Sequence, residues 1–371
     1  MKKYGKFLCI AVVIVMVLTL AACGGNKGGS APPSEPSAPS GGGTAPAAAP
    51  APEDWEGLHL IMVTNYPRDS YNTYIYDYWL ERVGEVSDGK ITGEIFGGET
   101  LMKNTDQLPG VLEGTADVIL TDPAYNPEYF PLLGGFFLPG FILNNSSVST
   151  YVAGDLLRET DYAETHQLKM LWANGLTPPA LYGNKKFTKL EDFPGAQIRA
   201  NGFAVDTVNN LGATAVALTS AEVYEALLKG TVDDTLMGLD ALMTFNLAEV
   251  SKYVCKSPGL TNIFHYAGMN LDTWNKIPAD IQAKIDEVNI ECTEVQAPRW
   301  DSAAQQGIDL AIENDAEISE IAPEEMARIF DALSGMRADW VAKMEAQGLD
   351  GQATLDYLDS LADKYNKQFP N

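Results

Sequence analysis

The chain has 371 residues, of which 46% are hydrophobic, and a formal net charge of -25 at pH 7. A chain of this length and apolar content can bury a large core, either as one two-lobed domain or as two ordinary domains. The acidic excess argues against nucleic acid as a partner, because nucleic-acid binding needs basic surfaces.

The first 22 residues have the pattern of an export signal. Three lysines among the first six residues precede an apolar stretch over residues 7–20, which is short for a membrane span and is flanked as a signal peptide is. The sequence Leu-Ala-Ala-Cys at residues 20–23 resembles a bacterial lipoprotein cleavage site. We therefore expect a signal peptide over residues 1–22 and acyl chains on Cys23 that anchor the protein at the outer face of the cytoplasmic membrane. An ordinary secretory signal with an incidental cysteine is the alternative.

Residues 23–54 have the composition of a tether. Gly24 to Asp54 contains seven Pro, seven Gly, seven Ala and four Ser in 31 residues, without apolar periodicity. Such a composition predicts a flexible segment that cannot bury a core. The segment would let the folded body stand clear of the membrane and still reach a partner in it.

Short apolar runs alternate with helical stretches in the first half of the body. In chain order we predict strand, helix, strand, helix and strand over residues 58–64, 70–86, 90–96, 106–114 and 116–120. This alternation indicates parallel strands with helical crossovers, and hence an α/β layered lobe. Ligands of such sheets bind beyond the carboxyl ends of the strands, which points to Asn65 and Tyr66 and to residues 122–125.

The tyrosines of this half fall into two groups. Tyr71, Tyr74 and Tyr78 follow Ser70, a predicted N-cap, at helical spacing, which favours core packing over ligand contact. Tyr66 and Tyr125 lie at strand ends, where a ligand contact and a structural role are equally expected. A helix over residues 144–166 and a strand over residues 168–172 then lead through residues 175–179 into a second lobe.

The stretch 195–234 combines strong periodicity with one buried charge. Apolar runs at residues 196–200 and 215–218 predict strands, each followed by a helix. Ser220 is the predicted N-cap of the second helix, and Gly230 is its predicted end. Arg199 lies inside the first of these strands, where an unpaired guanidinium would be very costly. An anionic partner is therefore expected, either the carboxylate of a ligand or an internal acid.

The residues of this stretch occur in an order that resembles a known family. The matching residues are Gly195, Ile198, Arg199, Leu211, Gly212, Ala213, Ser220, Glu222, Val223, Tyr224, Ala226, Leu227, Gly230, Val232 and Asp233. The order resembles the extracytoplasmic solute receptors of tripartite ATP-independent periplasmic (TRAP) transporters, the dicarboxylate-receptor-like family. A weaker likeness runs from Leu58 to the C-terminus.

The resemblance implies a two-lobed trap of the periplasmic-binding-protein type, with a long helix that spans both lobes. Its arginine would hold the carboxylate of an organic acid, which the receptor delivers to a small and a large membrane subunit. We expect lobe I over residues 55–176 and 267–305 and lobe II over residues 177–266 and 306–371.

The remaining elements follow from periodicity. We predict a helix over residues 240–254, a strand over residues 261–269 and a helical stretch over residues 278–315. Two final helices are predicted over residues 323–348 and 353–368. Pro298 should kink the helical stretch or divide it into two helices.

The sequence departs from the family where a second polar partner for the ligand would stand. Residues 234–237 and 177–179 lack the asparagine and the second arginine that the resemblance would place there. We therefore expect a monocarboxylate with a bulky apolar or aromatic body, contacted by Leu236 and Met237; the alternative is that these two are core residues. The full set of predicted ligand-binding residues is Asn65, Tyr66, Tyr125, Trp172, Arg199, Asn201, Phe203, Leu236, Met237 and His265.

Signals for catalysis are weak. The three histidines, His59, His166 and His265, lack the spacing of metal ligands, and the common nucleophile, metalloprotease and phosphate-loop motifs are missing from the sequence, so neither a metal nor a cofactor is expected. Glu222 could act as an acid or base with Asp233, but a carboxylate in the first turn of a helix is also stabilised there. A receptor for an ATP-driven importer and an exported hydrolase or lyase remain as alternative functions. Cys255 and Cys292 could pair or stay free; their spacing in the sequence decides nothing.

Overall fold

The computed structural model describes residues 55–159, 168–177, 179–257 and 259–370. The predicted signal peptide, the tether with its acylated Cys23, and His166 and Pro178 lie outside the described residues. Over the parts of the chain that are described, no helix is long and apolar enough to cross a membrane.

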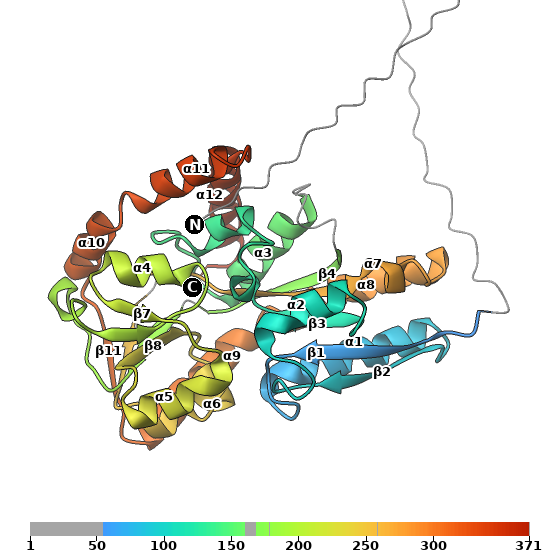
Figure 1. Cartoon of the computed structure of the whole chain (residues 1–371), viewed down its shortest axis with the longest axis horizontal. Coiled ribbons are helices and arrows are strands. Elements are labelled where there is room, and N and C mark those ends of the chain that lie inside the picture. Colours follow the sequence, from blue (N-terminus) through green and yellow to red (C-terminus); the bar gives the residue numbers. More distant parts are fainter. Residues whose placement is uncertain (1–54, 160–167, 178, 258, 371) are drawn as a thin grey trace, which may run out of the picture. The chain divides into compact units, whose positions relative to one another are not determined.

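The first sheet has five strands in the order β2-β1-β3-β10-β4 (Figure 1). The strands are β1 (Leu58–Thr64), β2 (Ile91–Phe96), β3 (Val118–Thr121), β4 (Leu168–Gly175) and β10 (Phe264–Asn270). As predicted, β1 is parallel to β2 and β3, whereas β10 runs antiparallel to both β3 and β4. Because β1 and β3 are parallel neighbours, the residues that follow them meet at one edge of the sheet.

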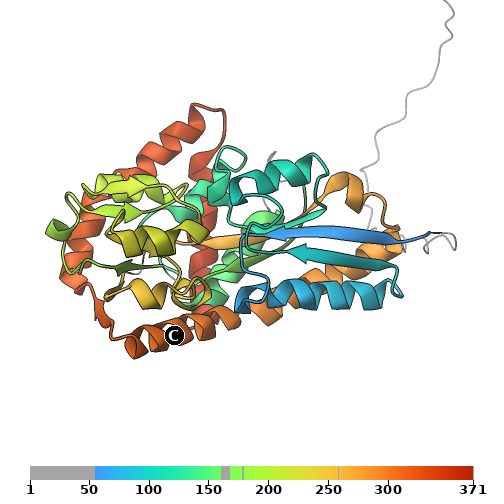
Figure 2. The ribbon, with the colours of Figure 1, turned by 60° about the horizontal axis from the view of Figure 1, so that its bottom comes forward.

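Four longer helices pack on this sheet. They are α1 (Tyr74–Val86), α2 (Asn104–Leu112), α3 (Ser146–Glu159) and α8 (Ala279–Gln296). Figure 2 shows α1 running along β1 and β2. The buried face of α1 consists of Ile75, Tyr76, Trp79 and Val83.

The predicted core stripe of tyrosines is confirmed only in part, because Tyr78 packs partly buried against the core of the first sheet whereas Tyr74 lies outside it. Tyr74 is 42% exposed, and the Arg299 guanidinium lies 4.0 Å from its ring centre and 4.4 Å from that of Tyr71. Ser70 precedes a short turn of 3-10 helix but makes no capping hydrogen bond with its side chain. Two residue sets have helical spacing here. The buried set includes Ile75 and Val83, which have no polar atom, whereas every residue of the other set carries a hydroxyl group that favours contact with water.

The second sheet has six strands in the order β11-β9-β5-β8-β6-β7. The strands are β5 (Ala180–Gly183), β6 (Gln197–Arg199), β7 (Thr214–Val216), β8 (Asp234–Met237), β9 (Tyr253–Lys256) and β11 (Glu317–Glu320). The predicted helix over residues 240–254 is wrong: two short turns, α6 (Ala241–Thr244) and Leu247–Val250, precede β9. The backbone of Asn246 is left-handed, with φ 56°, which ends the helix there.

The order strand, helix, strand, helix over residues 195–234 is confirmed. Helix α4 (Ala204–Asn210) follows β6, and α5 (Val223–Lys229) ends at Gly230 with φ 68°. Thr219 takes the N-cap position that was predicted for Ser220, and its N–H donates to the Glu222 carboxylate at 2.8 Å. Glu222 thus has the structural role that its place in the first turn indicated.

Pro298 ends one helix and precedes the next, α9 (Arg299–Glu313). The remaining helices are α7 (Leu271–Trp274), α10 (Pro323–Ala332), α11 (Met336–Glu345) and α12 (Gly351–Gln368). Leu358 and Tyr365 of α12 share a core with α3 and Phe264 of β10. The expected lobe II includes residues 306–371, and this packing favours placing α12 with the first lobe instead.

The two cysteines of the described body are free and buried. Cys255 lies in the core of the second sheet, and Cys292, on α8, lies in a core of the first sheet. The alternative of a disulfide between them does not hold, because each belongs to a different core.

Candidate functional site

A cavity of about 30 Å³ lies where the two sheets present the carboxyl ends of β1, β3, β6 and β8. It brings together seven of the predicted ligand-binding residues: Asn65, Tyr66, Tyr125, Arg199, Asn201, Met237 and His265. Eight further lining residues were not predicted as ligand contacts: Asp122, Leu176, Ser220, Gly238, Asp240, Ala241, Phe245 and Ile263. Asp122 belongs to the segment 122–125, to which the binding of ligands beyond the carboxyl ends of strands had pointed. Its own contact with the ligand was not predicted.

Arg199 ends β6 and is 2% exposed. Its Nε and Nη2 donate to the carbonyl oxygen of Leu218 at 3.0 and 2.7 Å, and Nη2 lies 3.4 Å from the hydroxyl oxygen of Tyr125. Nη1 makes no hydrogen bond with any residue that the structure describes, and no carboxylate among those residues forms an ion pair with the guanidinium. Asp122 lines the same cavity, and the Arg199 charge opposes the rise of its pKa, but no hydrogen bond joins the two groups.

Several hydrogen bonds join the lobes around this cavity. The hydroxyl groups of Tyr125 and Ser220 are 2.8 Å apart, and the Asn72 amide donates to Asp240 at 3.0 Å. Ser220 therefore contacts the first lobe instead of capping its own helix. The lobes of this conformation touch at the rim of the cavity.

The aromatic wall of the cavity is centred on Tyr66, which is 3% exposed. Its hydroxyl lies 3.1 Å from Nδ1 of His265, and its ring stacks on Phe245 with centres 6.0 Å apart. Burial lowers the pKa of His265 to about 3, so this imidazole is neutral at pH 7. Histidine here is a neutral hydrogen-bonding group and not a cation.

Two buried carboxyl groups have raised pKa values. Burial raises the pKa of Asp122 to about 7, against the opposing effects of the Ala124 N–H and the nearby Arg199 charge. Burial likewise raises the pKa of Asp240 to about 6, although the Asn72 amide stabilises its charge. Desolvation dominates at both residues, as expected for carboxyl groups enclosed between lobes.

Three predicted residues lie elsewhere. Trp172 packs on Trp79, with ring centres 5.8 Å apart, and Leu236 belongs to the core of the second sheet. Phe203 packs on Phe137, with ring centres 4.7 Å apart and the rings tilted by 33°. For Leu236 the alternative of a core residue is correct, whereas Met237 lines the cavity.

Phe203 lines a larger cavity of about 560 Å³ beside α11. Trp340 and Met344 contribute to its apolar wall, but its charged residues are all exposed: Glu128, Asp206, Asp339 and Lys343. A charged ligand gains most from a buried partner, which this cavity lacks. We therefore favour the smaller cavity as the ligand site. Among the described residues, no group of three or more His, Cys, Asp or Glu side chains could hold a metal ion.

The chain is similar to solute-binding proteins, both by its match to a family model and by its likeness to individual relatives. Residues 63–343 match the model of "Bacterial extracellular solute-binding protein, family 7". A solute-binding protein of Albidiferax ferrireducens is 22% identical over 263 residues, which cover 68% of this chain and 73% of the relative. The C4-dicarboxylate-binding periplasmic protein DctP of Rhodobacter capsulatus is 24% identical over 221 residues, covering 58% of this chain and 65% of the relative.

Solved structures share the fold. A TRAP solute binding protein from Rhodoferax ferrireducens T118, in complex with copurified benzoate, has a TM-score of 0.78 at 20% identity and covers 84% of this chain and 99% of its own. A marine metagenome TRAP solute binding protein specific for aromatic acid ligands, in complex with metahydroxyphenylacetate, has a TM-score of 0.78 at 22% identity. The match covers 83% of this chain and 99% of that protein's chain. The two-lobed architecture predicted from the sequence is thus confirmed.

Proposed function

Because the chain belongs to the bacterial extracellular solute-binding proteins of family 7, which include the TRAP transporter receptors, we propose that it holds the carboxylate of an organic acid on Arg199. It then delivers the acid to the small and large membrane subunits of a TRAP transporter. Membership in this family separates the proposal from a receptor for an ATP-driven importer, which would share the lobes but not the family. An exported hydrolase or lyase would have to turn the bound acid over.

The observation that carries the proposal is the state of the Arg199 guanidinium. It is buried, it is held in place by the Leu218 carbonyl, and its Nη1 is left without a hydrogen-bond acceptor in the described chain. A carboxylate can accept two parallel hydrogen bonds from a guanidinium, which gives both strength and orientation. A ligand carboxylate would therefore complete the bonding of this group.

The rest of the lining supports a monocarboxylate with an apolar or aromatic body. Among the described residues of the lining, Arg199 is the one basic residue, so a second carboxylate would meet no cationic partner among them. Leu176, Met237, Phe245 and Ile263 provide the apolar surface. Benzoate and metahydroxyphenylacetate, the ligands of two relatives with the same fold, are monocarboxylates of this kind.

Replacing Arg199 by lysine tests the proposal. Lysine keeps the charge but loses the planar pair of donors, so affinity for the cognate acid should fall by roughly thirty-fold to several thousand-fold, which corresponds to about 2–5 kcal/mol. The acid is found by a thermal-shift screen of aromatic, branched-chain and four-carbon organic acids, and its affinity is measured by titration calorimetry.

The matched control is Arg328→Lys, because Arg328 is half-exposed on α10 and remote from the cavity lining. Wild-type affinity in a folded Arg199→Lys protein would refute the role of Arg199. Stabilisation by succinate or malate, without any by aromatic or branched-chain acids, would refute the ligand class and leave the receptor function intact.

TRAP solute-binding proteins are periplasmic. We propose that this chain is held at the outer face of the cytoplasmic membrane through Cys23, on the basis of its lipoprotein-like cleavage sequence. Residues 23–54 would then be the tether between that anchor and the lobes.

A further inference from the structure

Two carboxyl groups, Asp122 and Asp240, line the same cavity as Arg199. They come from different lobes, since Asp122 follows β3 and Asp240 follows β8. Their exposed fractions are 5% and 2%. Capture of a carboxylate by Arg199 does not explain them, because the ionised form of each repels an anion that enters the cavity.

The cavity also has acceptor atoms without donors. Oδ1 of Asp122 accepts from the Ala124 N–H at 2.8 Å, while its Oδ2 makes no hydrogen bond with any described residue. The amide oxygen of Asn65, which is 4% exposed and lines the cavity, has no hydrogen-bond donor within the described chain. Buried acceptors in folded proteins normally have donors. A ligand that carries donors would provide them here.

Formal charge leads to the same requirement. Among the described residues of the lining, Arg199 is the one positive group, while His265 is neutral. Asp240, with a pKa of about 6, is mostly ionised at pH 7, and Asp122, with a pKa of about 7, is about half ionised. A ligand with only a carboxylate would add a further negative charge beside this one guanidinium. A ligand that also carries an ammonium group would add a second positive charge and reduce this repulsion.

The acidic groups lie beside an aromatic wall. Tyr66 lines the cavity together with Asp122 and Asp240. Burial, as the largest cause, raises the pKa of its hydroxyl group, and the charges of Asp240, Tyr125 and Asp122 add to this effect. The stacked rings of Tyr66 and Phe245 both face the cavity. Ammonium groups bind favourably between carboxylates and aromatic faces.

We propose that the ligand is a zwitterion, an organic acid that also carries a protonated amine. Its carboxylate binds Arg199, and its ammonium group binds Asp122 and Asp240 beside the Asn65 amide oxygen and the ring of Tyr66. The inference rests on the proposed function and narrows its ligand class to amine-bearing acids with an apolar or aromatic body. In this respect the chain would differ from relatives that bind benzoate or metahydroxyphenylacetate.

Matched pairs of acids test the proposal on the wild-type protein at pH 7. The pairs are phenylalanine with 3-phenylpropionate, leucine with 4-methylpentanoate, and 4-(aminomethyl)benzoate with 4-methylbenzoate. By titration calorimetry, the preferred zwitterion should bind about tenfold or more tightly than its amine-free partner. If no zwitterion in the panel binds more tightly than its partner, the inference is wrong. If the amine-free acids still bind through Arg199, the proposed function stands; if neither kind of acid binds, both fail.

Amide variants locate the ammonium site. Asp122→Asn and Asp240→Asn should each weaken the preferred zwitterion by roughly ten- to a hundredfold more than they weaken its amine-free partner. The control is Asp234→Asn, a buried carboxyl of β8 that does not line the cavity. An equal loss for both members of a pair would mean general damage to the site and would contradict the ammonium contact. Should the variants not fold, the comparison on the wild-type protein still decides.

Discussion

At the scale of single residues, Asp234 is a buried carboxyl group that lies outside the ligand cavity. Its Oδ1 accepts from the Lys185 N–H at 2.8 Å, but its Oδ2 has no hydrogen-bond partner in the described chain. Burial, as the largest cause, raises its pKa from 3.8 to about 8. The folded protein therefore keeps a proton at pH values where the unfolded chain has lost it.

This proton gives a prediction for stability against pH. Because the folded pKa is raised, the contribution of Asp234 to stability is fully present below pH 3.8 and is lost as pH rises towards about 8. Asp234→Asn cannot ionise, so its free energy of unfolding should fall less than that of the wild type between pH 5 and 8. Urea unfolding at several pH values measures the difference. Asp331→Asn, at an exposed residue of α10, is the control, and identical pH slopes for wild type and Asp234→Asn would contradict the prediction.

Single residues also show what the sequence can and cannot predict. Arg199 could be found because a charge inside an apolar strand needs a partner. Leu236 and Met237 could not be separated, because neighbouring strand residues point to opposite faces and the sequence does not say which face meets the cavity. Asp240 was missed because the strand before it, β8, could not be recognised. The four residues of β8 are all buried, so they show no alternating pattern that would mark a strand end near Asp240.

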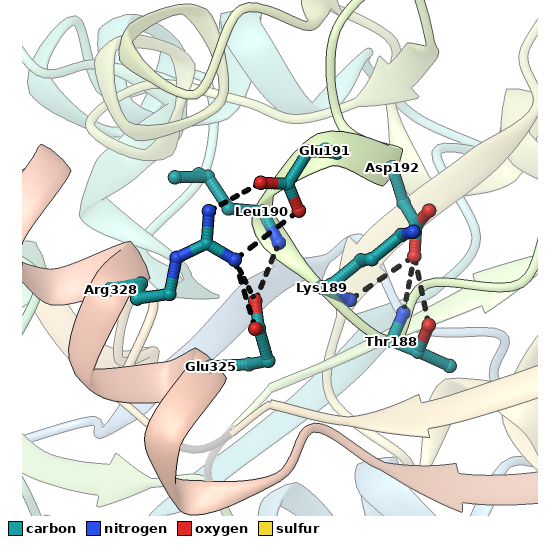
Figure 3. A network of polar contacts seen from close by, with 7 residues as sticks. All are labelled: Thr188, Lys189, Leu190, Glu191, Asp192, Glu325 and Arg328. Carbon is teal, nitrogen blue, oxygen red and sulfur yellow. Dashed lines mark hydrogen bonds and ion pairs between the residues drawn. The ribbon is translucent and has the colours of Figure 1, made fainter.

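At the scale of elements, α10 shows two kinds of attachment to the second lobe. Met326 and Ile329 are buried in its core. On the surface, Arg328 contacts both Glu191 and Glu325, and the Leu190 N–H lies 3.4 Å from the Glu325 carboxylate (Figure 3). Exposed ion pairs contribute little to stability, whereas burial of an isoleucine contributes much.

Paired substitutions on α10 should therefore differ strongly. Ile329→Ala leaves a cavity in the core and should lower the free energy of unfolding by about 2–5 kcal/mol. Arg328→Ala should change the midpoint of thermal unfolding only slightly, and less still at high salt. Thermal and urea unfolding at low and high salt measure both effects. A larger loss from Arg328→Ala than from Ile329→Ala would show that the network in Figure 3 holds the helix.

Elements with long periodic patterns were the ones predicted well. The strand Leu58–Thr64 and the division of the helical stretch at Pro298 are confirmed. The segment 240–254 looked helical from its apolar spacing, but the left-handed Asn246 and pairing of β9 with β5 override that pattern. Tertiary pairing of this kind depends on strands distant in the sequence, so local periodicity could not reveal it.

At the scale of the whole described body, the two lobes meet closely at one glycine. Gly202 follows β6 with φ 46°, and a Cβ atom there would lie 2.1 Å from the carbonyl oxygen of Ala124, just after β3. The cavity between the lobes measures about 30 Å³, far below the roughly 300–1,000 Å³ typical of ligand sites. The lobes must therefore separate to admit an acid and approach again around it.

A methyl group at position 202 should oppose that approach. Gly202→Ala should weaken binding of the cognate acid by roughly five- to a hundredfold, because overpacking typically costs about 1–3 kcal/mol in the closed state. The control is Gly230→Ala, which has the same kind of positive φ but open space around its Cβ position. Calorimetry should show a loss of affinity only for Gly202→Ala. Equal affinities in the two variants would mean that closure does not need this contact.

The two thiols of the described body give each lobe its own chemical reporter. Burial raises the pKa of Cys255 to about 11 and that of Cys292 well above its usual range, so neither is a reactive thiolate at neutral pH. An alkylating reagent would reach each sulfur only when the core around it opens. The rate of modification at Cys255 would then report the opening of the second lobe, and the rate at Cys292 that of the first lobe. No cysteine has to be introduced for this measurement, because both belong to the native sequence.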